Sequence, residues 1–331
     1  MLLREDTIMF SKKQTGFTLI ELMVSLVIGL FLLAGVFTIY LSSVKTKSVV
    51  DDEVEMMRNA QFALETLAFD LRHAGSYGLR NFEDKIKLMD EETLSGEAGE
   101  CGTDWAINID RAVYAADDAT DYAGTCMQNW SQGDTLEFRY ATPLPIGTLE
   151  ENLQPNAIYL KAIPKYAYMF LGDTPPPSFP FIKDDGSEKD NIRYFLWQSR
   201  AYYVADFTDE AGDGIPSLRL LALEPGPNVT DSILLRGVED VQIKFGLDTP
   251  LAGNSQGNAS ANMYVNPDSV GNRWNQVIAA RIWVVVRSEK ETDELVNNPA
   301  YEVAGSFVTP TDKYRRIVVS TTVRLRNLNT F

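Results

Sequence analysis

One stretch near the start decides the fold of this chain: Gly16-Phe17-Thr18-Leu19-Ile20-Glu21-Leu22. It opens an apolar run, 17–41, that contains a single charge, Glu21, and no proline. At about 1.5 Å of rise per residue, a helix over this run is roughly 37 Å long and exceeds the ~30 Å hydrocarbon layer of a membrane. A carboxylate in such a segment costs on the order of 2.5–3.5 kcal/mol near its centre and less toward an end, so Glu21 requires a partner.

Two ordinary kinds of segment compete for this run, a secretory signal and an uncleaved signal anchor. A secretory apolar region spans about 7–15 residues and is followed by a small-residue cleavage site. Here the run is longer, and its small residue, Gly16, comes before it. A plain anchor explains neither Glu21 nor a glycine that follows a basic leader with Lys12 and Lys13. A different processing signal is therefore favoured.

The leader, Gly16 and the Phe-Thr-Leu-Ile-Glu-Leu sequence after it resemble the type IV prepilin signal. The resemblance implies that a prepilin peptidase cuts between Gly16 and Phe17 and that the new amino group of Phe17 is N-methylated. It also implies that Glu21 neutralises the Phe17 amine of a neighbouring subunit in a filament. Such a buried pair fixes the register of the subunits without adding net stability. The leader would be cytoplasmic and the rest would lie outside.

Helical periodicity predicts that the helix continues from Phe17 to about His73. One face is expected to pack on a β-sheet; its residues are Val50, Val54, Met57, Gln61, Leu64, Leu67 or Ala68, and Leu71. The expected division is a cleaved cytoplasmic leader, a transmembrane or filament-core helix, an amphipathic continuation of that helix and a β-rich periplasmic or extracellular head. These four parts cover residues 1–16, 17–41, 42–76 and 77–331.

Beyond residue 78 helical periodicity is scarce, and segments of alternating or β-branched residues are separated by turn residues. About eight strands are predicted: Thr135–Ala141, Ala157–Ile163, Tyr166–Leu171, Ile192–Ala205, Ser217–Leu223, Val238–Leu247, Val277–Ser288 and Arg316–Arg326. The expected fold class is α+β and pilin-like, with the long N-terminal helix packed on a large, mostly antiparallel β head.

Four blocks of the later sequence are similar to the PilW family of minor pilins, to which the J-type pseudopilins of type II secretion are related. They are Asp70–Gly75, Gly237–Ile243, Trp274 with Val277–Ser288, and Arg315–Asn327. Many major pilins have a proline that kinks the apolar helix, whereas no proline precedes Pro143 here. The resemblance therefore favours a minor pilin over a subunit of the main shaft.

The resemblance implies a structural subunit that helps to prime type IV pilus assembly and sits at or near the pilus tip, in twitching, adhesion or DNA uptake. The expected partners are prepilin peptidase, other minor pilins, the major pilin and a PilY-type tip adhesin. The chain would be a single-pass inner-membrane protein with a periplasmic head, and then part of an extracellular pilus (fimbrium). The alternative is a J-type pseudopilin of type II secretion or competence. A more distant alternative is a membrane-anchored periplasmic binding protein.

Residue types that carry catalysis are scarce, so an enzyme is not expected. The single histidine, His73, falls in the last turn of the helix, where a capping or packing role is favoured. Without a second histidine, a His-based zinc site or a Ser-His-Asp triad elsewhere in the head is excluded. The net charge of −16 makes the chain a poor match for a phosphate backbone, so direct nucleic-acid binding is not expected.

The head contains both cysteines, Cys101 and Cys126, which are expected to oxidise to a disulfide in the periplasm. The bridge would close a loop of about 26 residues, worth roughly 3.5 kcal/mol in the chain-entropy model. Asp209 and Asp213 lie in an acidic, Gly-containing turn and are the candidate ligands for calcium. The EF-hand pattern fails, because Ile215 and Pro216 follow, so a solvated hairpin turn is favoured. No other cofactor or metal is expected.

Overall fold

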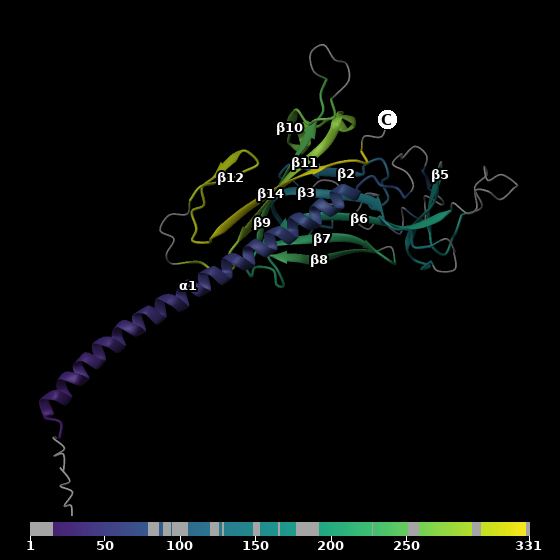
Figure 1. Cartoon of the computed structure of the whole chain (residues 1–331). Helices are drawn as coiled ribbons and strands as arrows, with labels where there is room; N and C mark the ends of the chain where they lie inside the picture. Colours follow the sequence, from purple (N-terminus) through teal and green to yellow (C-terminus); the bar gives the residue numbers. More distant parts are fainter. Residues whose placement is uncertain are drawn as a thin grey trace, which may run out of the picture. The chain divides into compact units, whose positions relative to one another are not determined.

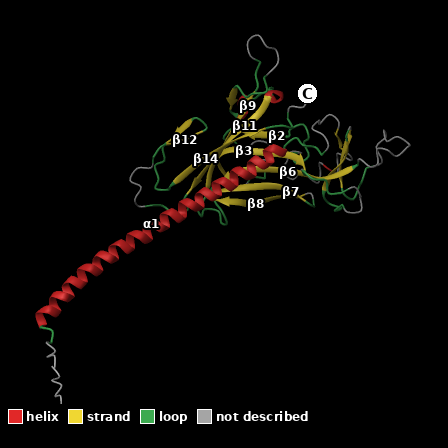
Figure 2. Cartoon of the chain, in the orientation of Figure 1, coloured by secondary structure: helices red, strands yellow, loops and turns green. Residues whose placement is uncertain are grey.

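A computed structural model of the chain (Figure 1 and Figure 2) describes residues 16–78, 86–88, 94, 105–119, 126–127, 129–147, 153–164, 166–176, 192–226, 228–250, 258–292 and 299–328. It divides into two compact units, Met1–Glu53 and Val54–Phe331. The described part of the first unit is almost entirely helix, the N-terminal portion of α1 (Leu19–His73). The second unit contains the rest of α1 and all the strands.

Helix α1 is uninterrupted because no proline or helix-breaking pair lies within it. It ends where Gly75 adopts a left-handed backbone (φ 77°), the conformation in which glycine commonly closes a helix. The predicted end at His73 is confirmed, and the helix begins at Leu19, two residues later than predicted. Among the described residues, α1 is the one helix that is long and apolar enough to cross a membrane, judged by length and composition.

An eight-stranded sheet forms the larger part of the second unit. Its strands are β1 (Ile86–Leu88), β2 (Val113–Ala116), β3 (Trp130–Ala141), β4 (Ile158–Ile163), β5 (Tyr166–Leu171), β6 (Arg193–Ala205), β7 (Ser217–Glu224) and β8 (Asn228–Arg236). The order is β1-β5-β4-β6-β3-β2, and β7 and β8 extend it from β6. All pairs are antiparallel except β1–β5. The long strand β6 connects the halves, because its first residues pair with β4 and its later ones with β3 and β7.

A second, antiparallel sheet has the order β10-β9-β11-β14. Its strands are β9 (Val238–Leu247), β10 (Met263–Val265), β11 (Val277–Arg287) and β14 (Arg316–Arg324). Two short 3₁₀ helices, η4 (Pro267–Ser269) and η5 (Trp274–Gln276), connect β10 to β11. The hairpin of β12 (Tyr301–Val303) and β13 (Ser306–Val308) lies between β11 and β14 in the sequence. One long helix and a large, mostly antiparallel β domain confirm the predicted fold class.

The main hydrophobic core lies between the last part of α1 and strands of both sheets, which Figure 1 shows side by side. The buried helix residues are Met56, Ala60, Ala63, Leu64, Leu67, Ala68, Asp70 and Leu71. The prediction of a helix face packed on a sheet is therefore correct from Leu64 onward. It is wrong before that residue, because Val50, Val54 and Met57 are exposed and Ala60 and Ala63 are buried instead. The inward face of this part of the helix consists of Met56, Ala60 and Ala63, and the two methyl side chains allow close approach of helix and sheet.

The eight predicted strands all occur, with ends displaced by a few residues. Six further described strands were not predicted: β1, β2, β8, β10, β12 and β13. Strand β2 was missed because its segment lies in an acidic, weakly periodic region. Strand β8 reads Asn-Val-Thr-Asp-Ser-Ile-Leu-Leu-Arg and was assigned to no element. It pairs only with β7, so its side chains are mostly part-exposed and its hydrophobic signal is weak.

A buried carboxylate joins the two sheets. Asp134 on β3 accepts hydrogen bonds from the backbone N–H of Asp118 (3.0 Å) and of Ile243 on β9 (2.7 Å). Burial raises the pKa of Asp134 to about 7, although these two hydrogen bonds act to lower it, and the nearby Asp117 and Asp118 raise it further. Burial likewise raises the pKa of Asp240 on β9 to about 6.

These raised pKa values predict how stability depends on pH. A carboxyl whose pKa in the folded state exceeds its unfolded value of about 3.9 binds protons preferentially in the native protein. The free energy of unfolding should therefore increase as the pH falls from about 8 to about 5, with Asp134 contributing at most on the order of 3 kcal/mol. Denaturant midpoints at several pH values measure this change in the free energy of unfolding. Asp134→Asn should reduce the pH dependence of the free energy of unfolding, whereas the control Asp110→Asn, at an exposed site, should not. The same pH dependence in Asp134→Asn and the wild type would contradict the role given to Asp134.

Candidate assembly site

The predicted cleavage site precedes the helix. Gly16, Phe17 and Thr18 lie outside regular structure, and α1 begins at Leu19. A Cβ atom added to Gly16 would meet no atom within 4 Å, and Phe17 is 87% exposed. The peptide bond between Gly16 and Phe17 is therefore in an extended, accessible segment of the kind that a peptidase can bind.

Thr18 and Glu21 form a capping box at the start of α1. The Glu21 carboxylate accepts hydrogen bonds from the backbone N–H and the hydroxyl of Thr18, both at 2.9 Å. In return, the Thr18 hydroxyl accepts the backbone N–H of Glu21 at 3.4 Å. This reciprocal arrangement satisfies N–H groups that have no partner within a helix. Glu21 is thus held in the first turn, and Thr18 supplies a partner within its own chain.

The rest of the first unit presents apolar side chains outward. Over 17–50 the residues are exposed, apart from Gly29 and Val49, which are half-buried. The exposed fractions include 76% for Phe31 and 66% for Leu32. An exposed apolar surface of this extent is the mark of a membrane or protein contact. Within it, Glu21 is the single charge before Lys45, so this part of the helix offers one charged contact point.

A buried carboxylate in the second unit fixes the end of α1 to the sheet. Asp70 is fully buried, and its two oxygens accept the hydroxyls of Tyr140 on β3 (2.6 Å) and Tyr202 on β6 (2.5 Å). The guanidinium of Arg200 on β6 pairs with the same carboxylate at 3.1 Å. We name these four residues the helix anchor. It ties α1 to two neighbouring strands by hydrogen bonds with a defined geometry.

Electrostatics keep the helix anchor in one protonation state. Burial raises the pKa of Tyr202, and the neighbouring Asp70 carboxylate raises it further. The pKa of Tyr140 is raised for the same two reasons. Burial acts to lower the pKa of Arg200, but Asp70, Tyr140 and Tyr202 together outweigh it and the pKa is raised. Both phenols therefore remain donors and Arg200 remains charged at physiological pH.

Sequence reasoning did not find the helix anchor, although one signal pointed to it. Asp70 lies three residues after Leu67 and one before Leu71, on the face that the same reasoning assigned to the sheet. An acid on a buried helix face requires buried partners. The sequence contains many tyrosines and arginines, so the partners were not identifiable without the fold.

The remaining predicted residues fall in several places. His73 Nδ1 is 2.8 Å from the carbonyl of Phe69, and its ring contacts Phe69 and Tyr140, which fits a packing role at the helix end. Cys126 is half-buried against a further hydrophobic cluster that includes Trp105 and Trp197. Cys101 lies outside the described residues, so the disulfide stays a prediction.

The two candidate calcium ligands are engaged within the protein. Asp213 accepts the backbone N–H groups of Thr208 and Ile215 and the Thr208 hydroxyl. The Thr208 hydroxyl is the main cause that lowers the pKa of Asp213 to about 2. Asp209 pairs with Arg236 at 2.8 Å. Among the described residues no group of three or more acidic, histidine or cysteine side chains is placed to hold a metal.

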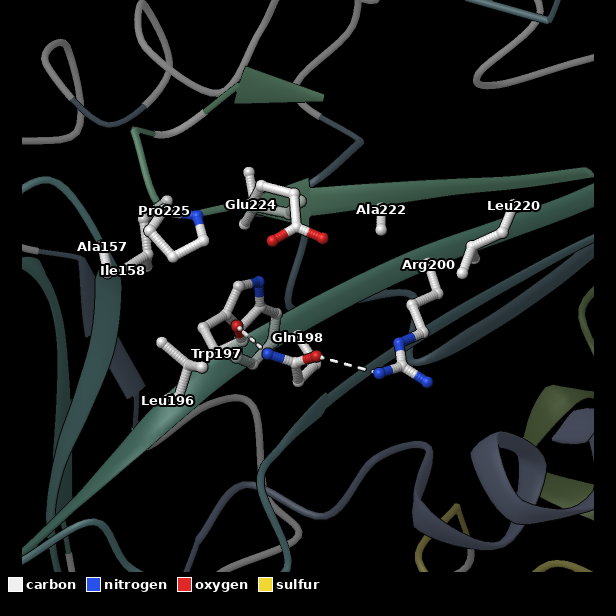
Figure 3. A pocket seen from close by; sticks show the side chains of 11 residues that line it. Ala157, Ile158, Leu196, Trp197, Gln198, Arg200, Leu220, Ala222, Glu224 and Pro225 are labelled. Carbon is white, nitrogen blue, oxygen red and sulfur yellow. Dashed lines mark hydrogen bonds between the residues drawn. The ribbon is translucent and has the colours of Figure 1, made fainter. Parts of the chain in front are cut away.

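A groove of about 220 Å³ lies between β4, β6 and β7 (Figure 3). Its lining includes Leu196, Gln198, Arg200, Leu220 and Glu224. Arg200 donates hydrogen bonds to the side-chain oxygen Oε1 of Gln198 and to the Asp70 carboxylate, so its charge is already compensated. Small-molecule sites usually have volumes of about 300–1,000 Å³ and present free polar groups. The groove therefore does not favour the binding-protein alternative.

Comparison with known proteins gives two family matches. Residues 11–37 match the prokaryotic N-terminal methylation motif, and residues 201–327 match the type IV pilus-assembly protein W family, PilW. No match is found among curated protein sequences. Among solved structures, the chain is similar to the type IV-like pilin TTHA1219 from Thermus thermophilus, with 12% identity over 83% of this chain and 97% of that chain and a TM-score of 0.33.

The methylation motif followed by a long apolar helix defines the class: the chain is a type IV pilin-like protein, with a segment suited to membrane anchoring and pilus association. The PilW match runs from the middle of β6 to the end of β14 and contains three of the four blocks noted in the sequence. The resemblance to PilW-type minor pilins is thereby confirmed. Pilins of this kind are structural rather than enzymatic, are processed by prepilin peptidase and associate with other pilins.

Proposed function

We propose that the chain is a minor pilin that helps to prime type IV pilus assembly and stays at or near the pilus tip. One observation carries the proposal: an exposed apolar helix with its single carboxylate, Glu21, in the first turn, directly after an accessible Gly16–Phe17 bond. After cleavage and N-methylation, the amine of a neighbouring Phe17 is the natural partner for that carboxylate.

The proposed mechanism is non-enzymatic. In the inner membrane the apolar helix holds the processed subunit, and the capping box satisfies Glu21. During assembly the helix moves from lipid to a bundle of pilin helices, and Glu21 meets the adjacent amine. Other minor pilins, the major pilin and a PilY-type adhesin are the proposed neighbours, and the periplasmic head becomes exposed on the pilus.

Cell experiments test this function directly. In a strain that lacks the chromosomal copy, few or no pili are expected, and the wild-type chain supplied in trans should restore them and be found in sheared pili. Labelling with gold-conjugated antibody should place the chain at filament ends. Restoration of type II secretion or competence instead of piliation would favour the pseudopilin alternative, and labelling along the shaft would contradict the tip location.

Cleavage gives a separate prediction. Gly16→Ala should be cut partially, because alanine adds one methyl group, whereas Gly16→Glu should block cleavage by placing a charged side chain at the bond. The measurement is the shift of the band on a gel in cells with and without prepilin peptidase. A normal shift for Gly16→Glu would contradict the assignment of the site. Ser48→Glu places the same charged side chain at an exposed position of α1, outside the processing signal, and serves as the control.

A further inference from the structure

The four-stranded sheet has an outer face that the helix does not cover. Its inner face contributes Val241, Ile243, Ile282, Val284 and Val323 to the core. Side chains alternate along a strand, so the residues between them point outward. Six of these outward residues form what we name the outer patch: Lys244 on β9, Tyr264 on β10, Arg281 and Trp283 on β11, and Thr322 and Arg324 on β14.

The strand register brings the outer patch together. Arg281 lies opposite Lys244 on one side and Thr322 on the other. Its guanidinium carbon is 5.4 Å from the ring centre of Tyr264 and 5.8 Å from that of Trp283. Its Nε donates a hydrogen bond to the Thr322 hydroxyl at 3.0 Å. The Arg281 side chain is therefore held in place, and it remains exposed.

The cations of the outer patch differ from several other arginines of the head. Ion pairs occupy Arg139, Arg200, Arg219, Arg236 and Arg316. Within the described part of the chain, no carboxylate pairs with Lys244, Arg281 or Arg324. In a chain with net charge −16, three uncompensated cations on one sheet face form a local positive site. An anionic partner would complement it.

The surroundings of the outer patch favour a folded protein over a nucleic acid. The turn of the β12–β13 hairpin borders it: a Cβ added to Gly305 would lie 3.7 Å from Lys244 Nζ. Phe307 on this hairpin is 78% exposed. Arginine with tryptophan, tyrosine and phenylalanine is the composition of protein-interface hot spots. On the other side, the exposed Asp118 is bonded to Gln242 and would repel a continuous polyanion.

We propose that the outer patch docks a folded protein through carboxylates on that partner's surface, which pair with Arg281 and Arg324. Arg281 is pre-positioned by Tyr264, Trp283 and Thr322, so little side-chain freedom is lost on binding. Taking the partner to be the head of a neighbouring pilus subunit rests on the proposed function. The docking chemistry does not depend on it.

Photo-crosslinking of the full chain in pilus-forming cells tests the proposal. In one strain a photoreactive residue replaces Ser320, which is exposed and lies opposite Trp283. In a parallel strain it replaces Thr230 on the edge strand β8. The Ser320 position should give a crosslink to one protein, at a peptide that contains Asp or Glu. Arg281→Glu should reduce this crosslink at least tenfold. The matched charge reversal Lys290→Glu, at an exposed site beyond the end of β11, should leave it unchanged.

An exchange of charges between the two partners tests whether Arg281 pairs with a carboxylate. Replacing the carboxylate in the crosslinked peptide with lysine should restore crosslinking to the Arg281→Glu chain. The proposal is overturned if the crosslink survives Arg281→Glu. It is also overturned if the photoreactive residue at position 320 gives no crosslink. So does Arg281-dependent binding of a dT20 oligonucleotide by the purified chain in detergent, measured by fluorescence anisotropy. Equal denaturant midpoints of the variants exclude unfolding. Cleavage and recovery in sheared pili, scored in the same cells, separate failure of docking from failure of the pilin function.

Discussion

Replacing Glu21 with alanine is expected to leave cleavage intact and to reduce incorporation into pili by at least 100-fold. The variant removes the partner of a neighbouring amine in an apolar bundle, and an uncompensated buried charge costs about 3–5 kcal/mol. It also removes one side of the capping box, which costs about 1 kcal/mol. Loss of the carboxylate charge therefore accounts for most of the expected loss of incorporation. The measurement is the amount of the chain in sheared pili relative to the amount in membranes.

Two variants separate the charge from the cap. Glu21→Gln keeps an oxygen that can accept from Thr18 but loses the charge, so it should behave like Glu21→Ala. Thr18→Ala keeps the charge and weakens the cap, so incorporation should fall less than tenfold. Piliation at wild-type levels with Glu21→Gln would show that the carboxylate charge has no role in assembly.

The second large effect is expected for Asp70→Ala, which should lower the free energy of unfolding of the head by about 3–5 kcal/mol. The variant leaves two buried phenol hydroxyls without an acceptor and removes the partner of Arg200. Urea denaturation of the full chain in detergent, followed by tryptophan fluorescence, measures the loss. Trp197 lies on β6, the strand that also carries Arg200 and Tyr202, and contributes to this signal with the other four tryptophans of the chain.

The exposed Asp51 on the same helix provides the control, because Asp51→Ala should change stability by less than about 0.5 kcal/mol. The loss of stability for Asp70→Asn should lie between those of Asp70→Ala and Asp51→Ala. The amide oxygen can accept a hydrogen bond from one tyrosine hydroxyl, but it carries no charge to pair with Arg200. A loss below 1 kcal/mol for Asp70→Ala would mean that the helix anchor contributes little to the attachment of α1.

Much of this fold follows from the sequence because its signals are local. An apolar run with one carboxylate specifies the helix start, and Gly75 specifies its end. Long strands such as β9 and β11 alternate or are rich in valine, and they were predicted with small errors at their ends. Edge strand β8 escaped prediction because half-exposed residues dilute the alternation.

Features that depend on distant pairs could not be derived in the same way. Ala60 and Ala63 are buried because the sheet approaches the helix closely there, which no hydrophobic ranking of the helix predicts. The helix anchor joins residues that are 70 and 132 positions apart in the sequence. The proposed processing site, in contrast, is a contiguous motif, so Gly16, Phe17 and Glu21 could be proposed from the sequence alone.

The capping box has a consequence for the traffic of subunits between membrane and filament. Because Thr18 already gives Glu21 two hydrogen bonds, an unassembled subunit does not leave its carboxylate bare in lipid. In the proposed assembly, Glu21 exchanges its hydrogen bonds with Thr18 for a contact with a neighbouring amine. The free energy gained by this exchange is smaller than the free energy gained when a carboxylate without any hydrogen bond finds a partner. A nearly balanced exchange can run in both directions. On the proposed function, we expect that subunits released from a filament can return to the membrane.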